Sequence, residues 1–316
     1  MYPTYELETS IQPSIIDMSI NPINATTIER TLKAHADGKL STPIISFGPP
    51  SKPMKGGSIF YNTKFNVLNP QGLPEANYGF FMVTNTRICS GPPKKGDYSD
   101  KRNYAGQEYR PLINLAISDL GAFGEQWVKL NDYWEAEAAR KVAEGFIKLG
   151  KRDIHALYYK VYGTGDKAGE IAANPSISIK VPVGQKYSDR HPIAALKGKN
   201  MLNIYDGRKP IRDAAGKHIG YEPYVHHNDQ GEPEEITVDN IDKVLTDGTV
   251  VVSAVFVGTG AAASTYTFSL PWTLYKIAII PPELDVPIVD TTDEVATTPT
   301  GPSEHTGSTA SSSSSA

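Results

Sequence analysis

Two apolar stretches near the end of the chain, TVVVSAVFVG at residues 249–258 and TYTFSLPWTLYKIAII at residues 265–280, are rich in β-branched and aromatic residues. Such stretches predict β-strands when Gly, Pro, Asn or Asp residues bound them. One strong amphipathic helix is predicted at residues 125–150, where apolar side chains recur every three or four positions. Similar strand patterns occur upstream, at residues 58–68, 77–88, 154–162, 176–183, 200–206 and 217–225. One long helix among many strands in meander order predicts a β-rich α+β fold, either a barrel or a sandwich with insertions.

Composition divides the chain into three parts. Residues 1–39 are predicted to be a weakly structured lead-in with one short helix at 25–38, and residues 40–282 to be a single domain. Residues 283–316 contain little apolar surface and end in SSSSSA, so they are predicted to be a disordered, Ser/Thr-rich tail.

Charge is distributed unevenly along the chain. The segment from Pro281 to Ala316 holds six acidic residues and no Lys or Arg, which leaves 29 of the 35 acids and all 31 bases in residues 1–280. A slightly basic body is therefore followed by an acidic tail. The single cysteine, Cys89, and the lack of a signal peptide or a long apolar span predict an intracellular protein with no membrane segment.

Motifs for catalysis are missing from the sequence. It contains no G-x-S-x-G, H-E-x-x-H, P-loop or C-x-x-C pattern. His226, His227 and Asp229 are the best candidate metal ligands, but adjacent residues on a strand point to opposite faces, which favours a solvated loop. Arg87 could lower the pKa of Cys89, yet no His partners the thiol, so a structural role is expected. The sequence predicts a protein that is not an enzyme and needs no cofactor.

Cations and aromatic rings are interleaved at residues 94–110, 148–167 and 180–217. Single-stranded nucleic acid needs both side-chain types, because cations neutralise phosphates and aromatic faces stack on unpaired bases. The alternative is a solvated surface with ordinary strand tyrosines. The last stretch also carries Arg208, Lys209, Arg212 and Lys217. The candidate DNA-binding residues in these stretches are Lys101, Arg102, Tyr104, Tyr158, Tyr159, Lys160, Tyr162, Lys180, Lys186 and Arg190.

The layout of residues 40–282 resembles that of the replicative single-stranded-DNA-binding proteins of podoviruses and nucleocytoplasmic large DNA viruses. The resemblance is carried by the helix at 125–150 and, in order, by NPSISIKVPV, NMLNIYDGRKPI, IDKVLTDGTVVVSAVFVG and TYTFSLPWTLYKIAII. It implies an OB-fold-like barrel that binds single-stranded DNA without sequence preference. It also adds Trp272, Tyr275 and Lys276 to the expected DNA contacts. In the podoviral members an acidic tail with a terminal aromatic residue contacts replication partners, whereas this tail lacks the aromatic residue.

Three functions follow as hypotheses. The first is a virus-encoded protein that coats single-stranded DNA in replication or repair, with replication proteins at the tail and other copies of the chain as further partners. The second is a viral structural or assembly protein with a β-sandwich, and the third is a metal-dependent hydrolase using His226, His227 and Asp229. A closed five-stranded Greek-key barrel would favour the first hypothesis, and two stacked sheets the second.

Overall fold

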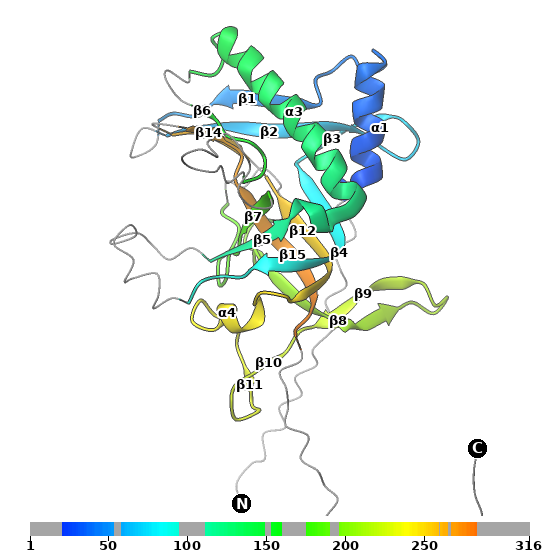
Figure 1. The fold of residues 1–316 in the computed structure, drawn as a ribbon, viewed down its shortest axis with the longest axis vertical. Helices are drawn as coiled ribbons and strands as arrows, with labels where there is room; N and C mark the ends of the chain where they lie inside the picture. The colour runs from blue at the N-terminus through cyan, green and yellow to red at the C-terminus, as the bar shows by residue number, and fades with distance from the viewer. Residues whose placement is uncertain are drawn as a thin grey trace, which may run out of the picture. The chain divides into compact units, whose positions relative to one another are not determined.

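The fold is seen in a computed structural model, which describes residues 21–53, 58–94, 111–148, 153–159, 175–189, 196–258, 260–264 and 267–282. These residues belong to one compact unit, Met1–Pro282. A barrel forms the middle of this unit, and a second sheet with two helices lies at one end of the barrel (Figure 1). The predicted tail, residues 283–316, is outside the described residues.

The barrel closes from five strands. Four neighbouring pairs in it are antiparallel, and the pair of β7 with β15 is parallel. The strands are β4 (Phe80–Ser90), β5 (Leu112–Ala116), β7 (Ser176–Lys180), β12 (Val250–Val257) and β15 (Trp272–Ile280). The circuit runs β4–β5–β7–β15–β12 and returns to β4, which is the order of an OB-fold barrel. The predicted β-rich fold with an OB-fold-like barrel is confirmed, although the parallel pair shows that the strands do not follow one another as a meander.

A second sheet is built from the N-terminal strands and from the connection between β12 and β15. Its order is β1–β2–β13–β14–β6, with β3 paired to the free part of β2. Both short strands between β12 and β15 belong to it, so the last connection of the barrel leaves the barrel and returns. The strands are β1 (Ile45–Pro50), β2 (Ile59–Leu68), β3 (Pro74–Asn77), β6 (Asp153–Ile154), β13 (Gly260–Ala263) and β14 (Thr267–Ser269).

The remaining strands and a single helical turn lie between β7 and β12. Strand β8 (Asn203–Arg212) adds to the barrel sheet beside β15 and forms a hairpin with β9 (His218–Pro223). A small hairpin of β10 (His226–His227) and β11 (Pro233–Glu234) follows, and then the single turn α4 (Ile241–Val244).

The long helix α3 (Gly121–Ala143) follows the 3₁₀ turn η1 (Ile117–Leu120) and covers the space between the barrel and the second sheet. The apolar side chains it buries recur at helical spacing: Phe123, Trp127, Leu130, Trp134 and Ala138. The predicted helix therefore exists, but it begins four residues earlier and ends at Ala143. Gly145 follows the end with φ 73°, a backbone conformation that favours glycine, and the expected stop at Gly150 is outside the described residues.

The helix in the expected N-terminal lead-in belongs to the folded core. Helix α1 (Ala25–Ala36) contacts α3 and β2 and buries Ile28 and Thr31. The hydroxyl of Thr31 accepts a hydrogen bond from the Leu68 amide at 3.0 Å, which fixes the helix to the end of β2. The expectation of weak structure over residues 1–39 is therefore wrong for 25–36, because an apolar face of this helix has a surface to pack against.

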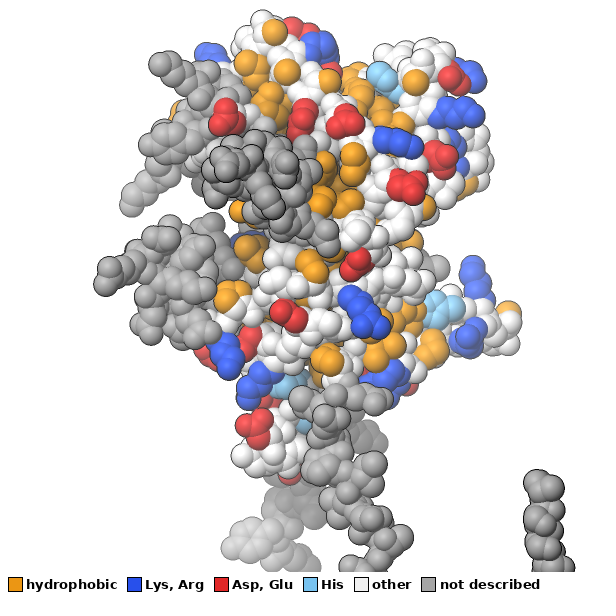
Figure 2. All heavy atoms as spheres, viewed as in Figure 1, with side chains coloured by type: hydrophobic (Ala, Val, Ile, Leu, Met, Phe, Trp, Pro, Cys, Tyr) orange, Lys and Arg blue, Asp and Glu red, His pale blue; other side chains and the backbone are white. Residues whose placement is uncertain are grey.

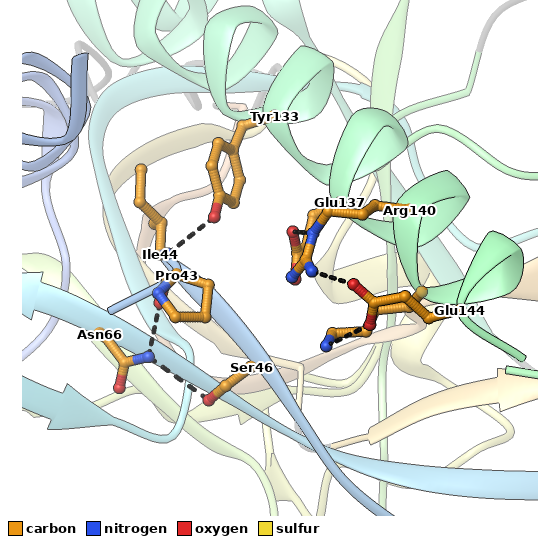
Figure 3. A network of polar contacts seen from close by, with 9 residues as sticks. Pro43, Ile44, Ser46, Asn66, Tyr133, Glu137, Arg140 and Glu144 are labelled. Atoms are coloured by element: carbon orange, nitrogen blue, oxygen red, sulfur yellow. Dashed lines mark hydrogen bonds and ion pairs between the residues drawn. The ribbon is translucent and has the colours of Figure 1, made fainter. Parts of the chain in front are cut away.

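A polar network fixes α3 to the start of β1 (Figure 3). The Ile44 amide donates to the Tyr133 hydroxyl at 2.9 Å, and the Asn66 side-chain amide donates to the Pro43 carbonyl at 2.6 Å. Burial raises the pKa of Tyr133, so the phenol stays protonated. Farther along α3, Arg140 is held between Glu137 and Glu144. None of the helices in the described part of the chain is long and apolar enough to cross a bilayer.

Glycine at position 258 is required by the closure of the barrel. A Cβ atom there would lie 2.4 Å from the ring of Trp272, which is itself buried. We expect Gly258→Ala to lower the free energy of unfolding by about 1–3 kcal/mol, because the core has no room for the methyl group. Urea denaturation measures this. The control is Gly260→Ala, whose new Cβ would meet only the Tyr61 carbonyl oxygen, at 3.4 Å. Equal stability of the two variants would contradict the prediction.

Candidate nucleic-acid interface

The second and third strands of an OB-fold barrel form its usual binding surface, together with the loops between strands one and two and between strands four and five. In this chain the strands are β5 and β7, and the loops are residues 91–111 and 258–271. Alternation divides each strand into an inner and an outer face. Ile113, Leu115, Ile177 and Ile179 are fully buried. Leu112 and Asn114 of β5 therefore lie on the outer face, opposite Lys180 and Ser178 of β7.

Polar side chains join the two strands on this outer face. The Ser178 hydroxyl donates to the side-chain oxygen of Asn114 at 2.5 Å. Beside this pair, Leu112 is 41 % exposed and Lys180 is half-buried. The face thus offers an ammonium group next to apolar surface, which suits a polyanion with flat bases. We call residues Leu112, Asn114, Ser178 and Lys180, together with Tyr159, the β5–β7 face.

A cleft of about 440 Å³ opens at the edge of this face. Its walls come from α3, from β7, from the segment that follows β6 and from the chain that enters β15. The lining residues are Glu135, Ile154, His155, Ala156, Leu157, Tyr158, Tyr159, Ser178, Ser269, Leu270, Pro271 and Trp272. Two of the predicted tyrosines therefore lie in one cleft with a β7 residue.

Backbone hydrogen bonds hold Tyr159 at the start of β7. Its amide donates to the Ser176 carbonyl at 2.7 Å, and the Ser176 amide donates back at 3.1 Å. The Tyr159 side chain is 61 % exposed although its backbone is fixed. A large ring on a fixed backbone can stack on a base with little loss of conformational entropy. Tyr158 is half-buried and packs against the main core.

The prediction that Trp272 contacts DNA is wrong. Its ring packs edge-on against Phe81 and Phe256 and is only 4 % exposed. Its indole N–H donates to the Leu157 carbonyl at 3.0 Å. The ring cannot stack on a base, because its faces are occupied within the core. Trp272 instead fixes the segment that forms one wall of the cleft.

The prediction that Tyr275 contacts DNA is also wrong, and a β-bulge explains its position. Lys276 pairs with Val255 and Leu274 with Phe256, which leaves Tyr275 as the extra residue of β15. The ring of Tyr275 packs against Phe80 and Tyr187 beneath the segment that follows β7. Burial raises the pKa of Tyr187 well above its usual range. Lys276 stays half-buried beside Asn203 of β8.

Other predicted residues have different locations. Lys186 is exposed, in a bridge to Asn200 on the segment between β7 and β8, away from the cleft lining. Lys101, Arg102, Tyr104, Lys160, Tyr162 and Arg190 lie outside the described residues. The first three belong to the segment that rejoins the described chain at Pro111, and Lys160 and Tyr162 belong to the segment that leaves it at Tyr159. Both junctions adjoin β5 or β7.

Three residues of the β5–β7 face were missed by the sequence predictions, namely Leu112, Asn114 and Ser178. The alternation of Ile113 and Leu115 in LINLA, and of Ile177 and Ile179 in SISIK, is the signal that could have placed the residues between them on an outer face.

The structure gives His226 and Cys89 structural surroundings. His226 is buried with its Nε2 3.6 Å from a Glu234 carboxylate oxygen, whereas the neighbouring His227 is exposed. Within the described ranges, no group of three or more His, Cys, Asp or Glu side chains could hold a metal ion. Cys89 donates to the Asn114 carbonyl at 3.2 Å, and burial raises its pKa, so it remains a thiol.

Comparison with known proteins gives only weak likeness, in solved structures. No family model matches the chain, and no curated protein matches it. Among solved structures it is similar to gp2.5, a single-stranded DNA binding protein encoded by bacteriophage T7, with a TM-score of 0.27 and 11 % identity. The alignment covers 68 % of this chain and 97 % of that chain. A likeness of this size assigns no function, so the properties of the β5–β7 face have to be judged from this chain alone.

Two aromatic residues of the cleft should respond differently to substitution. Trp272→Phe leaves the Leu157 carbonyl without its donor in a buried place, so we expect unfolding free energy to fall by about 1–3 kcal/mol. Tyr159→Ala removes an exposed ring and should change it by less than about 0.5 kcal/mol. Chemical denaturation of both variants measures the difference. A large loss of stability in Tyr159→Ala would show that this ring supports the fold.

Proposed function

We propose that the chain binds single-stranded DNA across the β5–β7 face, without sequence preference and without catalysis. The observation that carries this proposal is the exposed ring of Tyr159 at one end of β7, with Lys180 at the other end and a cleft beside the strand. Tyr159 pairs with Ser176, the first residue of β7, and Lys180 is the last residue of that strand. Ser176 and Lys180 are four strand positions apart, roughly 13 Å. A single strand that follows β7 can therefore stack a base on Tyr159 and place a phosphate at Lys180.

Single strands suit this site better than duplex. Bases in a duplex are stacked on one another, so their faces cannot reach an aromatic side chain without unpairing. Stacking on a ring does not distinguish one base from another, because every base has a π-face. The side chains of Asn114 and Ser178, which could read base edges, donate and accept between themselves. These properties support binding without sequence preference.

The cationic and aromatic residues in segments 95–110 and 160–174 would extend the same interface. Lys101, Arg102 and Tyr104 belong to the loop between the first two barrel strands, which takes part in binding in OB-fold barrels.

Intermediates of DNA replication or repair inside the cell are the substrates we expect. The acidic segment 283–316 would contact replication proteins. The closed barrel favours this function over that of a β-sandwich assembly protein.

Binding should depend on Tyr159. We expect Tyr159→Ala to weaken binding of an unstructured oligonucleotide by about 1–3 kcal/mol, the usual value of one base stacked on an aromatic ring. Fluorescence anisotropy at low salt measures the affinity. The matched control is Leu73→Ala, which removes a side chain of the same 61 % exposure in the turn between β2 and β3. The proposal fails if the unmodified protein does not bind at low salt, or if the two variants bind equally well.

Binding should also depend on salt. Replacing Lys180 by Gln removes one cation from the face, so the slope of log affinity against log salt should become shallower by about 0.7. Titrations at several salt concentrations give the slope. The exposed Lys129 on α3 provides the control substitution Lys129→Gln, which should leave the slope unchanged. If Lys129→Gln changed the slope as much as Lys180→Gln, the salt dependence would reflect the overall charge of the protein and not a phosphate contact at Lys180.

A further inference from the structure

Strand β8 belongs to the barrel sheet for only part of its length. Asn203 to Asp206 pair with β15, whereas the later residues of β8 pair with β9 alone. Residues 207–222 therefore form a two-stranded ribbon that projects from the barrel (Figure 1). We call these residues the β8–β9 ribbon.

The ribbon contributes nothing to either hydrophobic cluster of the protein. Ile211, Ile219 and Tyr221 are half-exposed, and none of them packs against a buried cluster. A two-stranded hairpin without a second layer is marginally stable in water. Its position is fixed at the root, where buried Asp206 accepts two hydrogen bonds from the Arg208 guanidinium, at 2.9 and 3.0 Å. These bonds hold the pKa of Asp206 below its usual value.

One face of the ribbon combines cations with rings. Pro210 and Arg212 lie on the same face of β8, with Tyr221 opposite Pro210 and His218 opposite Arg212. The rings of His218 and Tyr221 are in contact, with centroids 4.6 Å apart. Figure 2 shows Lys or Arg side chains and a His at this projection, with no Asp or Glu on the side in view.

Two cations of the ribbon are not held in ion pairs. Lys209 lies 3.8 Å from Glu222, but Arg212 and Lys217 form no ion pair with any described residue. Arg212 donates to the Gly216 carbonyl at 2.9 Å across the turn. The carboxylate of Asp213 caps that turn by accepting from the amides of Ala215 and Lys217. The charges of Arg212 and Lys217 are therefore available to an anion in solution.

The ribbon and the β5–β7 face are neighbours along the same strand. Thr273 of β15 pairs with Lys180, and Lys276 pairs with Asn203, the first residue of β8. Lys276 is three positions beyond Thr273, about 10 Å along β15, and Ile279, which pairs with Asp206 at the root of the ribbon, is six positions beyond it, about 20 Å. A single strand that runs from Lys180 to the ribbon therefore follows one edge of β15. It passes Lys276 before it reaches the cations of the ribbon.

We propose that the β8–β9 ribbon is an arm that binds the phosphate backbone of the single strand as it leaves the β5–β7 face. This inference rests on the proposed function and extends it, because it makes the binding site longer than the barrel. The ribbon matches its partner in charge and is continuous with the proposed interface. A short strand fills the β5–β7 face alone, and only a longer strand reaches Arg212 and Lys217.

The test compares two oligo-dT lengths with the full chain. One has about 5 nucleotides and the other about 16, near the two limits of site size for an OB fold. The double variant Arg212→Ala, Lys217→Ala should bind the short oligonucleotide as the unmodified protein does. It should bind the long one more weakly, with a salt slope shallower by about 1.4, because two phosphate contacts are lost. The control is Lys33→Ala, Lys129→Ala, which removes two exposed cations from α1 and α3.

Each outcome separates the two proposals. If the unmodified protein binds neither oligonucleotide at low salt, the proposed function fails and the ribbon inference fails with it. If it binds both and the ribbon variant keeps the full affinity and slope for the long one, the ribbon inference alone is overturned. A variant that changes the oligomeric state in sizing experiments, but not the slope, would make the ribbon a contact between copies of the chain and would also overturn the inference.

Discussion

The buried indole of Trp272 is the contact on which the rest of the structure depends. Its ring packs against Phe81 and Phe256 of the barrel strands, and against Trp127 of α3. Its N–H reaches the Leu157 carbonyl, which belongs to the segment that leads to Tyr159. One side chain thus joins the barrel, the helix and the cleft. The candidate interface can hold a fixed shape because its walls are attached to the core at this point.

The long connection between β12 and β15 explains why barrel and second sheet form one body. Its strands β13 and β14 pair with β2 and β6, so the second sheet cannot move away from the barrel without breaking these pairings or displacing the connection between β12 and β15. In a simple OB-fold barrel this connection is a loop that takes part in binding. Here β13 and β14 of this connection are held by strand pairing with β2 and β6.

Much of the fold could be predicted from the sequence, and less of the site. Strands β12 and β15 and helix α3 are long and strongly patterned, so they were found. Strand β5 was missed because its five residues follow a long polar stretch, and closure of the barrel depends on pairing between distant segments that no local pattern encodes. Tyr159 and Lys180 were among the candidates that composition suggested, and the structure places both on the β5–β7 face. Trp272 and Tyr275 were misassigned because an aromatic residue in a strand looks the same whether its ring faces a partner or the core.

The bulge at Tyr275 has a consequence for charge. In a regular strand, side chains would alternate from Leu274 inward, so position 276 would point into the barrel among isoleucines. An ammonium group there would lose its hydration, which is strongly unfavourable for an unpaired charge. The extra residue shifts the alternation of the later side chains by one position. Lys276 therefore points out of the barrel, and Ile277 points into its interior. A local irregularity of the backbone thus places Lys276 on the outer face of a central strand, at a position that regular alternation from Leu274 would turn inward.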